Sequence, residues 1–454
     1  MRDGVLGLIG NTPLIQIKHI DTGPCDLFVK MESQNPGGSI KDRIGLSMIE
    51  AAEKDGRLKP GGTIVEATAG NTGLALALVA AAKGYKLSVV IPDKMSQEKI
   101  FHLRALGADI ALTRSDVGKG HPDYYQDVAE RIAKESGAYY VNQFANPANP
   151  LAHETTTGPE IWEQMDHKMD AMVAGVGSGG TMTGLSRFFA KVDPKIEMVL
   201  ADPLGSILAD YIATGVVRTD AGSWLVEGVG EDFIPPVCDL SRTKKAFTIP
   251  DEESFHTARE LLKKEGILAG SSSGMLVAGA LRYCREQKTK KRVVTFICDS
   301  GNKYLSKMFN DYWMADQGYL PREQFGDLRD VISRKYADRA VITVKPTDTL
   351  LRVYQQMKLY DVSQLPVMEG DKIVGLIDES DVLFAVSRDD TRFQSNVKDY
   401  MSTRLTTLQP KTPIESVNQI FDNGMVAIVC DGDRFLGLIT RSDMLNYLRR
   451  RRAS

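Results

Sequence analysis

The stretch that decides the fold is residues 62–84, GTIVEATAGNTGLALALVAAAKG. Its first six residues predict a short β-strand, and a glycine-containing loop follows them. Leu74 to Lys83 then predicts an apolar α-helix that Gly84 ends. The next apolar run, Leu87 to Ile91, has the composition of a second strand. The stretch therefore predicts a strand–loop–helix–strand unit, which is typical of a parallel sheet.

The same alternation continues through the first three hundred residues. Because the expected strands are continuously apolar, the sheets should be covered by helices on both faces. We therefore predict an α/β fold of two doubly wound halves, with a ligand in the crevice at the carboxyl ends of the strands. The further expected strands are 110–113, 139–141, 171–176, 198–201 and 293–298, and the further expected helices are 97–106 with Ser96 as N-cap, 123–135, a helix from Met182, 254–265 and 272–286.

The C-terminal third contains a duplicated unit. Residues 341–346 correspond to 405–410 at an offset of 64, and residues 373–383 correspond to 435–445 at an offset of 62. Each unit should form strand, helix, strand, strand and helix. Because so short a unit cannot bury its own apolar face, the two should pack together. We expect an α/β region at 1–318, a linker at 319–332, and the two repeats at 333–390 and 397–454.

Composition restricts the class of protein. The chain has 454 residues and a net charge of −3, which argues against a nucleic-acid partner. Apolar runs stay well short of the roughly 18 residues that a membrane helix needs, and the first residues do not read as a signal segment. The five cysteines are odd in number and lack a CxxC pair. We therefore expect no disulfide, no metal site and a cytoplasmic location.

Lys41, in the loop Gly37-Gly38-Ser39-Ile40-Lys41, is a candidate amine nucleophile. Taken alone it would be read as an exposed helix lysine, but the two glycines allow a ligand to approach closely. An amine that attacks an aldehyde must be neutral. The pocket must therefore lower the pKa of Lys41 by desolvation or by nearby positive charge.

Three loops of small residues add anion-binding capacity. Residues 177–181 combine three glycines with two hydroxyls at a helix N-terminus, which predicts a phosphate cradle without cationic side chains. In residues 68–73, Asn71 offers an amide to a phenolic oxygen, while the hydroxyls suit a carboxylate. Residues 271–273 open another helix, where serine is a common N-cap. A tight turn explains each loop alone, but together with Lys41 they favour pyridoxal phosphate.

Several motifs in one order resemble the pyridoxal-phosphate-dependent family of cysteine synthase and cystathionine β-synthase. The resemblance covers about residues 4–315 and implies a tryptophan synthase β-like, fold-type II catalytic region. The duplicated tail resembles a paired CBS module (Bateman module), and the lysine loop with this tail is most similar to the cystathionine β-synthase branch. The motifs are IGNTPL at 9–14, NPGGSIKDR at 35–43, KMSQEK at 94–99 and NPANPLAH at 146–153.

The resemblance implies a role for individual residues. Lys41 is the imine lysine and, once released, the proton shuttle. Asn71 contacts the pyridoxal 3′-oxygen, and Ser272 faces the pyridine nitrogen. The phosphate is held by Gly177, Ser178, Gly179, Gly180 and Thr181. The substrate carboxylate is bound by Thr68, Ala69, Thr72 and Gln143, with Ala69 in place of the usual serine.

Two further positions depart from the animal cystathionine synthases, in which Phe144 and Glu231 are replaced by tyrosines. Glu231 is a candidate for orienting the amino group of homocysteine, and a solvated loop acid is the alternative. The haem-binding extension of the animal forms has no counterpart before Ile9, so no haem is expected.

The resemblance implies a β-replacement that condenses L-serine or O-acetylserine with L-homocysteine to L-cystathionine through an α-aminoacrylate. A hydroxyl rather than a carboxylate at Ser272 weakens the electron sink and favours this elimination. The alternatives are a cysteine synthase that uses O-acetylserine and sulfide, a serine or threonine dehydratase, and an adenosyl-sensing protein with weak catalysis. We expect a homodimer or homotetramer with no nucleic-acid or membrane partner.

The tail carries a second candidate site. In the second repeat, Thr440 and Asp443 fit an adenosyl-binding pattern, in which the carboxylate takes both ribose hydroxyls. In the first repeat Asp381 is kept, but Asp378 occupies the threonine position and would repel a phosphate. S-adenosylmethionine, which carries a positive sulfonium, is therefore the expected ligand, chiefly at the second repeat.

Overall fold

The computed structural model describes residues 4–68, 70–92, 97–114, 117, 121–321, 323–387 and 389–453. The chain forms two compact units, Met1–Phe309 (unit 1) and Asn310–Ser454 (unit 2). Ala69 and the expected N-cap Ser96, with the first half of the KMSQEK motif, lie outside the described residues. A helix long and apolar enough to span a membrane does not occur in the described part of the chain.

Unit 1 contains two sheets, as the alternation of apolar segments predicts. Within the six-stranded sheet, β1 and β2 are antiparallel and all other neighbours are parallel. Its order is β1 (Leu14–Gln16), β2 (Asp26–Lys30), β10 (Arg292–Phe296), β7 (Ala171–Ala174), β8 (Glu197–Pro203) and β9 (Thr243–Ile249). The four-stranded sheet is wholly parallel, in the order β5 (Asp109–Thr113), β4 (Lys86–Pro92), β3 (Thr63–Ala67) and β6 (Tyr139–Tyr140).

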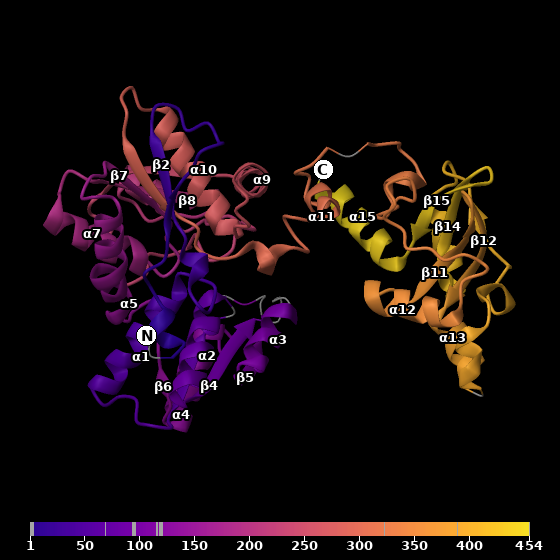
Figure 1. The fold of residues 1–454 in the computed structure, drawn as a ribbon, viewed down its shortest axis with the longest axis horizontal. Helices are drawn as coiled ribbons and strands as arrows, with labels where there is room; N and C mark the ends of the chain where they lie inside the picture. The colour runs from indigo at the N-terminus through magenta and orange to yellow at the C-terminus, as the bar shows by residue number, and fades with distance from the viewer. Residues whose placement is uncertain are drawn as a thin grey trace. The chain divides into compact units, whose positions relative to one another are not determined.

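Helices follow most of these strands (Figure 1). The expected helix at 254–265 is present, but its last turn is the π-helix η4 (Leu261–Glu265). A second π-helix, η3 (His153–Thr157), joins two short helices. The α-helices of unit 1 are α1 (Lys41–Lys54), α2 (Asn71–Lys83), α3 (Gln97–Ala105), α4 (Tyr125–Ser136), α5 (Ala148–Ala152), α6 (Gly158–Gln164), α7 (Gly180–Val192), α8 (Leu208–Thr214), α9 (Asp251–Glu260) and α10 (Ser271–Arg285).

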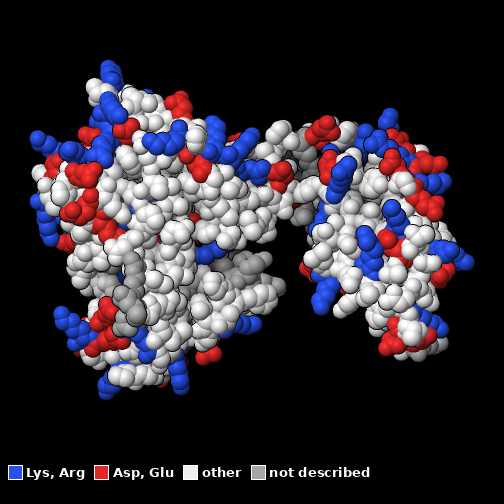
Figure 2. Space-filling model, viewed as in Figure 1, with Lys and Arg blue, Asp and Glu red and all other residues white. Residues whose placement is uncertain are grey.

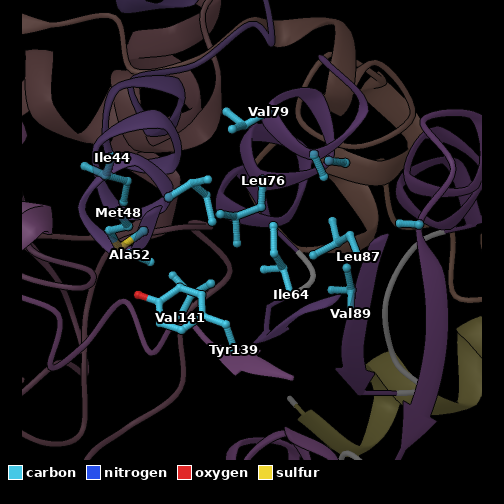
Figure 3. Close-up of a cluster of buried hydrophobic side chains, with 14 of the residues drawn as sticks. Ile44, Met48, Ala52, Ile64, Leu76, Val79, Leu87, Val89, Tyr139 and Val141 are labelled. Carbon is cyan, nitrogen blue, oxygen red and sulfur yellow. The ribbon is translucent and has the colours of Figure 1, made fainter. Parts of the chain in front are cut away.

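Apolar side chains cover both faces of the four-stranded sheet, which confirms the reading of its strands. On one face, Ile64 of β3 and Val89 of β4 pack in a cluster with α1 and α2 (Figure 3). On the other face, Val65 of β3 and Val90 of β4 pack against α4. Burying a valine or isoleucine side chain contributes about 1.5–3 kcal/mol. The alternation of the two sets along each strand fixes the strand register.

The sequence did not predict the strands β1, β2 and β9 or the helices α1, α5, α6 and α8. Strand β2 explains why, because it ends on Lys30, a charged residue whose side chain is 0% exposed. The Lys30 ammonium donates to Thr12 O at 2.7 Å, to Glu160 at 2.9 Å and to Gln164 at 2.8 Å. Those partners lie far away in the sequence, so a local pattern gives no sign that this lysine can be buried. Figure 1 shows β2, at the indigo end of the colour scale, within the sheet of later strands.

Unit 2 contains the duplicated module. The hairpin β11 (Gln364–Glu369) and β12 (Lys372–Asp378) corresponds to β14 (Ala427–Asp431) and β15 (Arg434–Ile439), and each hairpin has a register shift at the matching position. The other strand and the α-helices are α11 (Asp311–Asp316), α12 (Leu350–Tyr360), α13 (Glu379–Val386), β13 (Thr407–Leu408), α14 (Glu415–Asp422) and α15 (Arg441–Ala453).

The two repeats share a buried cluster, in which Met368 and Ile373 of the first repeat pack with Ile428 and Phe435 of the second. This confirms that the repeats pack against each other. One expectation was wrong: residues 341–346 form only an isolated bridge, Val344 to Val367, rather than a strand. The corresponding strand β13 in the second repeat is itself only two residues long. Pairing this brief depends on the neighbouring hairpin more than on local sequence.

Candidate active site

Unit 1 contains a cavity of about 690 Å³ at the carboxyl ends of β3, β7 and β10, where the fold predicts a ligand. Two of the residues predicted for this site are not among the described residues that line the cavity. Gly180 follows the lining residue Gly179 as the first residue of α7, and Ala69 lies outside the described residues. The cavity is lined by most of the residues that the sequence singled out, namely Lys41, Thr68, Asn71, Thr72, Gln143, Gly177, Ser178, Gly179, Thr181, Glu231 and Ser272.

Lys41 is the first residue of α1, and its side chain lines this cavity. Burial lowers the pKa of the Lys41 amine below its usual value, while Glu231 and Asp299 oppose that shift. A lowered pKa increases the fraction of neutral amine, which is the nucleophilic form. Its neighbour Arg43 instead forms buried ion pairs with Glu32 and Glu160 at 2.7 Å each, so Arg43 holds unit 1 together.

The loop at 177–181 leads into the N-terminus of α7. Gly179 has a φ of +86°, a left-handed conformation that favours glycine. At Gly180 an added Cβ would lie 1.8 Å from Asn149 Oδ1, so only glycine fits there. The first amides of an α-helix have no intrahelical acceptor, and they carry positive potential. The loop therefore presents backbone donors and two hydroxyls to the cavity, which suits a phosphate.

Two buried side chains that the sequence reasoning did not assign to the site hold the hydroxyls of this loop. Asn149 Nδ2 donates to Ser178 Oγ at 2.9 Å and to the Gln143 carbonyl at 2.8 Å. His153 contacts Thr181 Oγ1 through Nε2 at 3.1 Å. Both residues belong to the NPANPLAH motif at 146–153, which was the available signal. The motif therefore orients the hydroxyls of Ser178 and Thr181 in the phosphate loop.

Asn71 and Ser272 open helices on the cavity wall. Asn71 begins α2, and its amide is bonded to Asp299 at 2.8 Å and to Lys303 at 2.6 Å. Ser272 lies in the first turn of α10 and is 5% exposed. Burial raises the pKa of the neighbouring Cys298 thiol, and Ser272 opposes that increase slightly. The side chains of Asn71 and Ser272 can both offer hydrogen bonds to polar atoms of a ring held in the cavity.

Thr72 and Gln143 are paired, because Thr72 Oγ1 donates to Gln143 Oε1 at 2.8 Å. Thr68 Oγ1 accepts from the Gly70 amide at 3.3 Å. The side-chain nitrogen of Gln143 and the first-turn amides of α2 remain suitable donors for a carboxylate. These three side chains are brought together on one wall of the cavity.

Glu231 lines the cavity and is partly buried there. Burial raises the pKa of its carboxyl to about 8, nearby Asp232 and Asp202 add to the increase, and Lys41 opposes it. Its backbone is held in place, since the Glu231 amide donates to Ser206 Oγ at 3.1 Å. A rigidly placed acid that is costly to ionise alone can pair with a substrate cation.

In unit 2, Thr440 and Asp443 lie together at the start of α15. Asp443 Oδ2 accepts from the Thr440 amide at 2.7 Å and from the Thr440 hydroxyl at 2.6 Å. In the first repeat, Asp381 Oδ2 accepts from the Asp378 amide at 3.0 Å in the matching position. One oxygen of each acid is therefore already used at the start of its helix, which leaves the other oxygen for a ligand.

The cavity fits pyridoxal phosphate. It combines an enclosed amine, a glycine loop whose close contacts exclude side chains, and a buried serine and a partly buried asparagine at the starts of two helices. In the described residues, no group of three or more His, Cys, Asp or Glu side chains is arranged to hold a metal ion.

Comparison with known proteins agrees with this reading. The profile of the pyridoxal-phosphate-dependent enzymes matches residues 5–299, and the CBS domain profile matches residues 328–388 and 397–450. The chain therefore belongs to the family of pyridoxal-phosphate-dependent enzymes, and its tail consists of two CBS domains.

Within that family, cystathionine β-synthases are among the relatives that match over nearly the whole chain. The chain is 37% identical to that protein from Dictyostelium discoideum, over 98% of this chain and 92% of the relative. It is 45% identical to cysteine synthase A of Escherichia coli K12, over 66% of this chain and 92% of the relative. A solved hydrogen sulfide-producing enzyme from Fusobacterium nucleatum has a TM-score of 0.62 and 38% identity, over 67% of this chain and all of that one.

Proposed function

We propose that the protein condenses L-serine or O-acetylserine with L-homocysteine to give L-cystathionine. The observation that carries the proposal is a single cavity that joins Lys41, the phosphate loop, the Thr72–Gln143 pair and Glu231. The similarity to cystathionine β-synthase over nearly the whole chain, tail included, supports the same activity.

Each residue has a defined task in this proposal. Bound pyridoxal phosphate supplies an electron sink for the α-carbon of the amino-acid substrate. Lys41 attaches the cofactor, and its amine then takes the α-proton and returns it to the product. Water leaves the β-carbon of serine, or acetate leaves O-acetylserine, and the homocysteine sulfur takes its place. Asn71 would contact the phenolic oxygen and Ser272 the ring nitrogen. The phosphate would be held by residues 177–181, and the substrate carboxylate would be bound by Thr68, Ala69, Thr72 and Gln143.

Glu231 gives the acceptor preference. Homocysteine brings an ammonium group that sulfide lacks. A carboxyl with a raised pKa gains most from such a partner, because the nearby cation favours its ionised form. Phe144, which also lines the cavity, contacts Phe233 at 5.6 Å between ring centroids and adds apolar wall for the side chain of the acceptor.

Cysteine synthase activity is the second candidate, favoured by the 45% identity to cysteine synthase A over the catalytic region. The deciding experiment supplies serine or O-acetylserine with homocysteine or sulfide, and quantifies cystathionine and cysteine by mass spectrometry. A value of kcat/KM higher for homocysteine than for sulfide supports the proposal. The reverse order establishes the cysteine synthase, and pyruvate without either product establishes a dehydratase.

The proposal for the tail is that S-adenosylmethionine binds the second repeat, with Thr440 on the ligand's polar groups and the open oxygen of Asp443 on its ribose. In the first repeat, Asp381 would contribute to a site that binds the ligand more weakly.

We assign the protein to the cytoplasm as a homodimer or homotetramer. The location is supported by the five cysteines, each of which is a free thiol. Light scattering after size-exclusion chromatography would measure the oligomeric state.

Charge gives no support to a nucleic-acid partner. Figure 2 shows basic and acidic side chains interspersed around the rim of each unit on the face that it draws. The net charge is −3, so the chain has no excess of basic residues. Such an excess provides most of the electrostatic attraction to the phosphates of a nucleic acid.

A further inference from the structure

The side-chain amide of Asn71 is held at both ends by charged residues from a distant segment. Asn71 Nδ2 donates to Asp299 Oδ2 at 2.8 Å. Asn71 Oδ1 accepts from the ammonium of Lys303 at 2.6 Å. Lys303 lies in the 3-10 helix η5 (Gly301–Tyr304), just after β10. The segment that follows one strand thus controls a side chain at the start of a helix in the other sheet's half of unit 1.

These two contacts admit one orientation of the amide. A flip of the Asn71 side chain would turn its carbonyl oxygen toward Asp299 and its NH2 group toward the Lys303 ammonium. Both charge-assisted hydrogen bonds would be lost, and two like dipoles would face each other. The amide nitrogen carries two hydrogens, of which Asp299 accepts one. The second hydrogen is available to a ligand in the cavity that Asn71 lines.

Asp299 is itself fixed. Its side chain is 0% exposed, and its Oδ2 also accepts from the Tyr304 hydroxyl at 2.9 Å. Since Oδ2 accepts two hydrogen bonds, a proton on this carboxyl would sit on Oδ1, and Oδ2 would still accept from Asn71. Gly270 packs against Oδ1, where an added Cβ would lie at 1.8 Å. The hydrogen bond from Asn71 Nδ2 to Asp299 Oδ2 can therefore form in either protonation state of Asp299.

We infer that Asp299 and Lys303 are positioning residues that fix the Asn71 amide as a donor to the cofactor's phenolic oxygen, with Lys303 adding positive charge behind it. This inference rests on the proposed contact between Asn71 and that oxygen. An oriented donor and a nearby cation both favour the ionised oxygen. The two residues therefore lower the pKa of the bound chromophore and strengthen cofactor binding.

The test is a pH titration of the visible absorbance of the bound cofactor, together with the dissociation constant of pyridoxal phosphate. Lys303→Met removes the charge and the donor, and should raise the chromophore pKa by about one unit and the dissociation constant about 10-fold. Lys303→Arg should restore both values to within about 3-fold of wild type, because it retains a cationic donor. Asp299→Asn should shift the titration in the same direction, because its amide lets Asn71 flip.

Lys307→Met is the matched control. It removes the same charge from a nearby position that lines the cavity, but Lys307 Nζ contacts Glu227 at 2.8 Å rather than Asn71. A shift in Lys303→Met that clearly exceeds the shift in Lys307→Met supports positioning of Asn71. Equal shifts would mean that only the positive charge near the cavity matters, and they would overturn the inference. Asn71→Ala distinguishes the positioning of Asn71 by Lys303 from the proposed contact between Asn71 and the cofactor. If Asn71→Ala shifts the titration while Lys303→Met does not, Lys303 does not position Asn71, and the proposed function stands. If Asn71→Ala has no effect, the proposed Asn71 contact itself fails. Lys303 is only half-buried, so its variants test the idea even if Asp299→Asn does not fold.

Discussion

The Nε2 atom of His153 lies 3.1 Å from the hydroxyl of Thr181, and Nδ1 lies 2.9 Å from the hydroxyl of Thr157. The ring is fully buried, and burial lowers the pKa of His153 well below its usual value, with Lys41 and Arg43 adding to the decrease. A neutral ring donates at one nitrogen and accepts at the other. It therefore orients both hydroxyls from within the π-helix η3, a geometry that often marks functional sites.

Replacing His153 by leucine should weaken binding of pyridoxal phosphate about 10-fold, because the Thr181 hydroxyl loses its orienting partner. Equilibrium dialysis of the folded variant measures this change. His167→Leu is the control, since the His167 side chain is 54% exposed and pairs with Glu163 at the surface. Equal affinities for both variants would limit His153 to a packing role.

Lys41→Ala should reduce the rate of cystathionine formation by about 100-fold to 10,000-fold, because the Lys41 amine carries out the proton transfer. Circular dichroism should show an unchanged fold. The exposed Lys54 at the other end of the same helix provides the control, and Lys54→Ala should retain wild-type turnover. Near-normal rates in Lys41→Ala would remove the role assigned to it.

Glu231→Gln should raise the KM for homocysteine about 10-fold and leave the KM for sulfide nearly unchanged, because only homocysteine offers an ammonium to the carboxyl. Glu252→Gln, at an exposed acid in the first turn of α9, should alter neither value. Steady-state kinetics with both acceptors measures the difference. An equal rise for the two acceptors would mean that Glu231 shapes the cavity without recognising homocysteine.

Glu66 should make stability depend on pH. Its carboxyl is fully buried in β3, and burial raises its pKa from 4.5 to about 8. Between those values the folded state binds more protons than the unfolded state. The free energy of unfolding should therefore fall as the pH rises through this window, by up to about 1.4 kcal/mol per pH unit, and no further above it.

Glu66→Gln cannot ionise and should lack this contribution. Urea unfolding at several pH values gives the difference between wild type and variant, and that difference should shift in favour of the variant as the pH rises. Parallel curves for the two proteins would show that Glu66 keeps an ordinary pKa.

S-adenosylmethionine should raise the melting temperature of the wild type, because a ligand that binds only the folded state stabilises it. The increase should vanish in Asp443→Ala and persist in Asp381→Ala. The comparison is balanced, since each variant loses an acid that accepts a backbone hydrogen bond at the start of its helix. AMP and ATP serve as competing adenosyl compounds. No increase with any of them would leave the tail as an assembly module.

The sequence by itself determined the alternation of strands and helices and the duplication of the tail. Apolar runs such as Leu87–Ile91 specify their own strand, because burial on both faces requires continuous hydrophobicity. Lys41 and the loop at 177–181 were recognisable only in combination, because a candidate amine nucleophile together with loops suited to anions matches an aldehyde phosphate. Boundaries shifted by a few residues, since helix ends depend on local hydrogen bonds.

Only the tertiary structure decided which residues support these groups. Strand β2 was missed because its buried Lys30 is satisfied by Glu160, which lies 130 positions away. The contacts of Asn149 and His153 with the phosphate loop, and of Asp299 and Lys303 with Asn71, likewise join segments far apart in the chain. The raised pKa of Glu231 also follows from enclosure by other segments. A buried polar side chain is stable only when distant partners satisfy it, so the local sequence cannot specify its place.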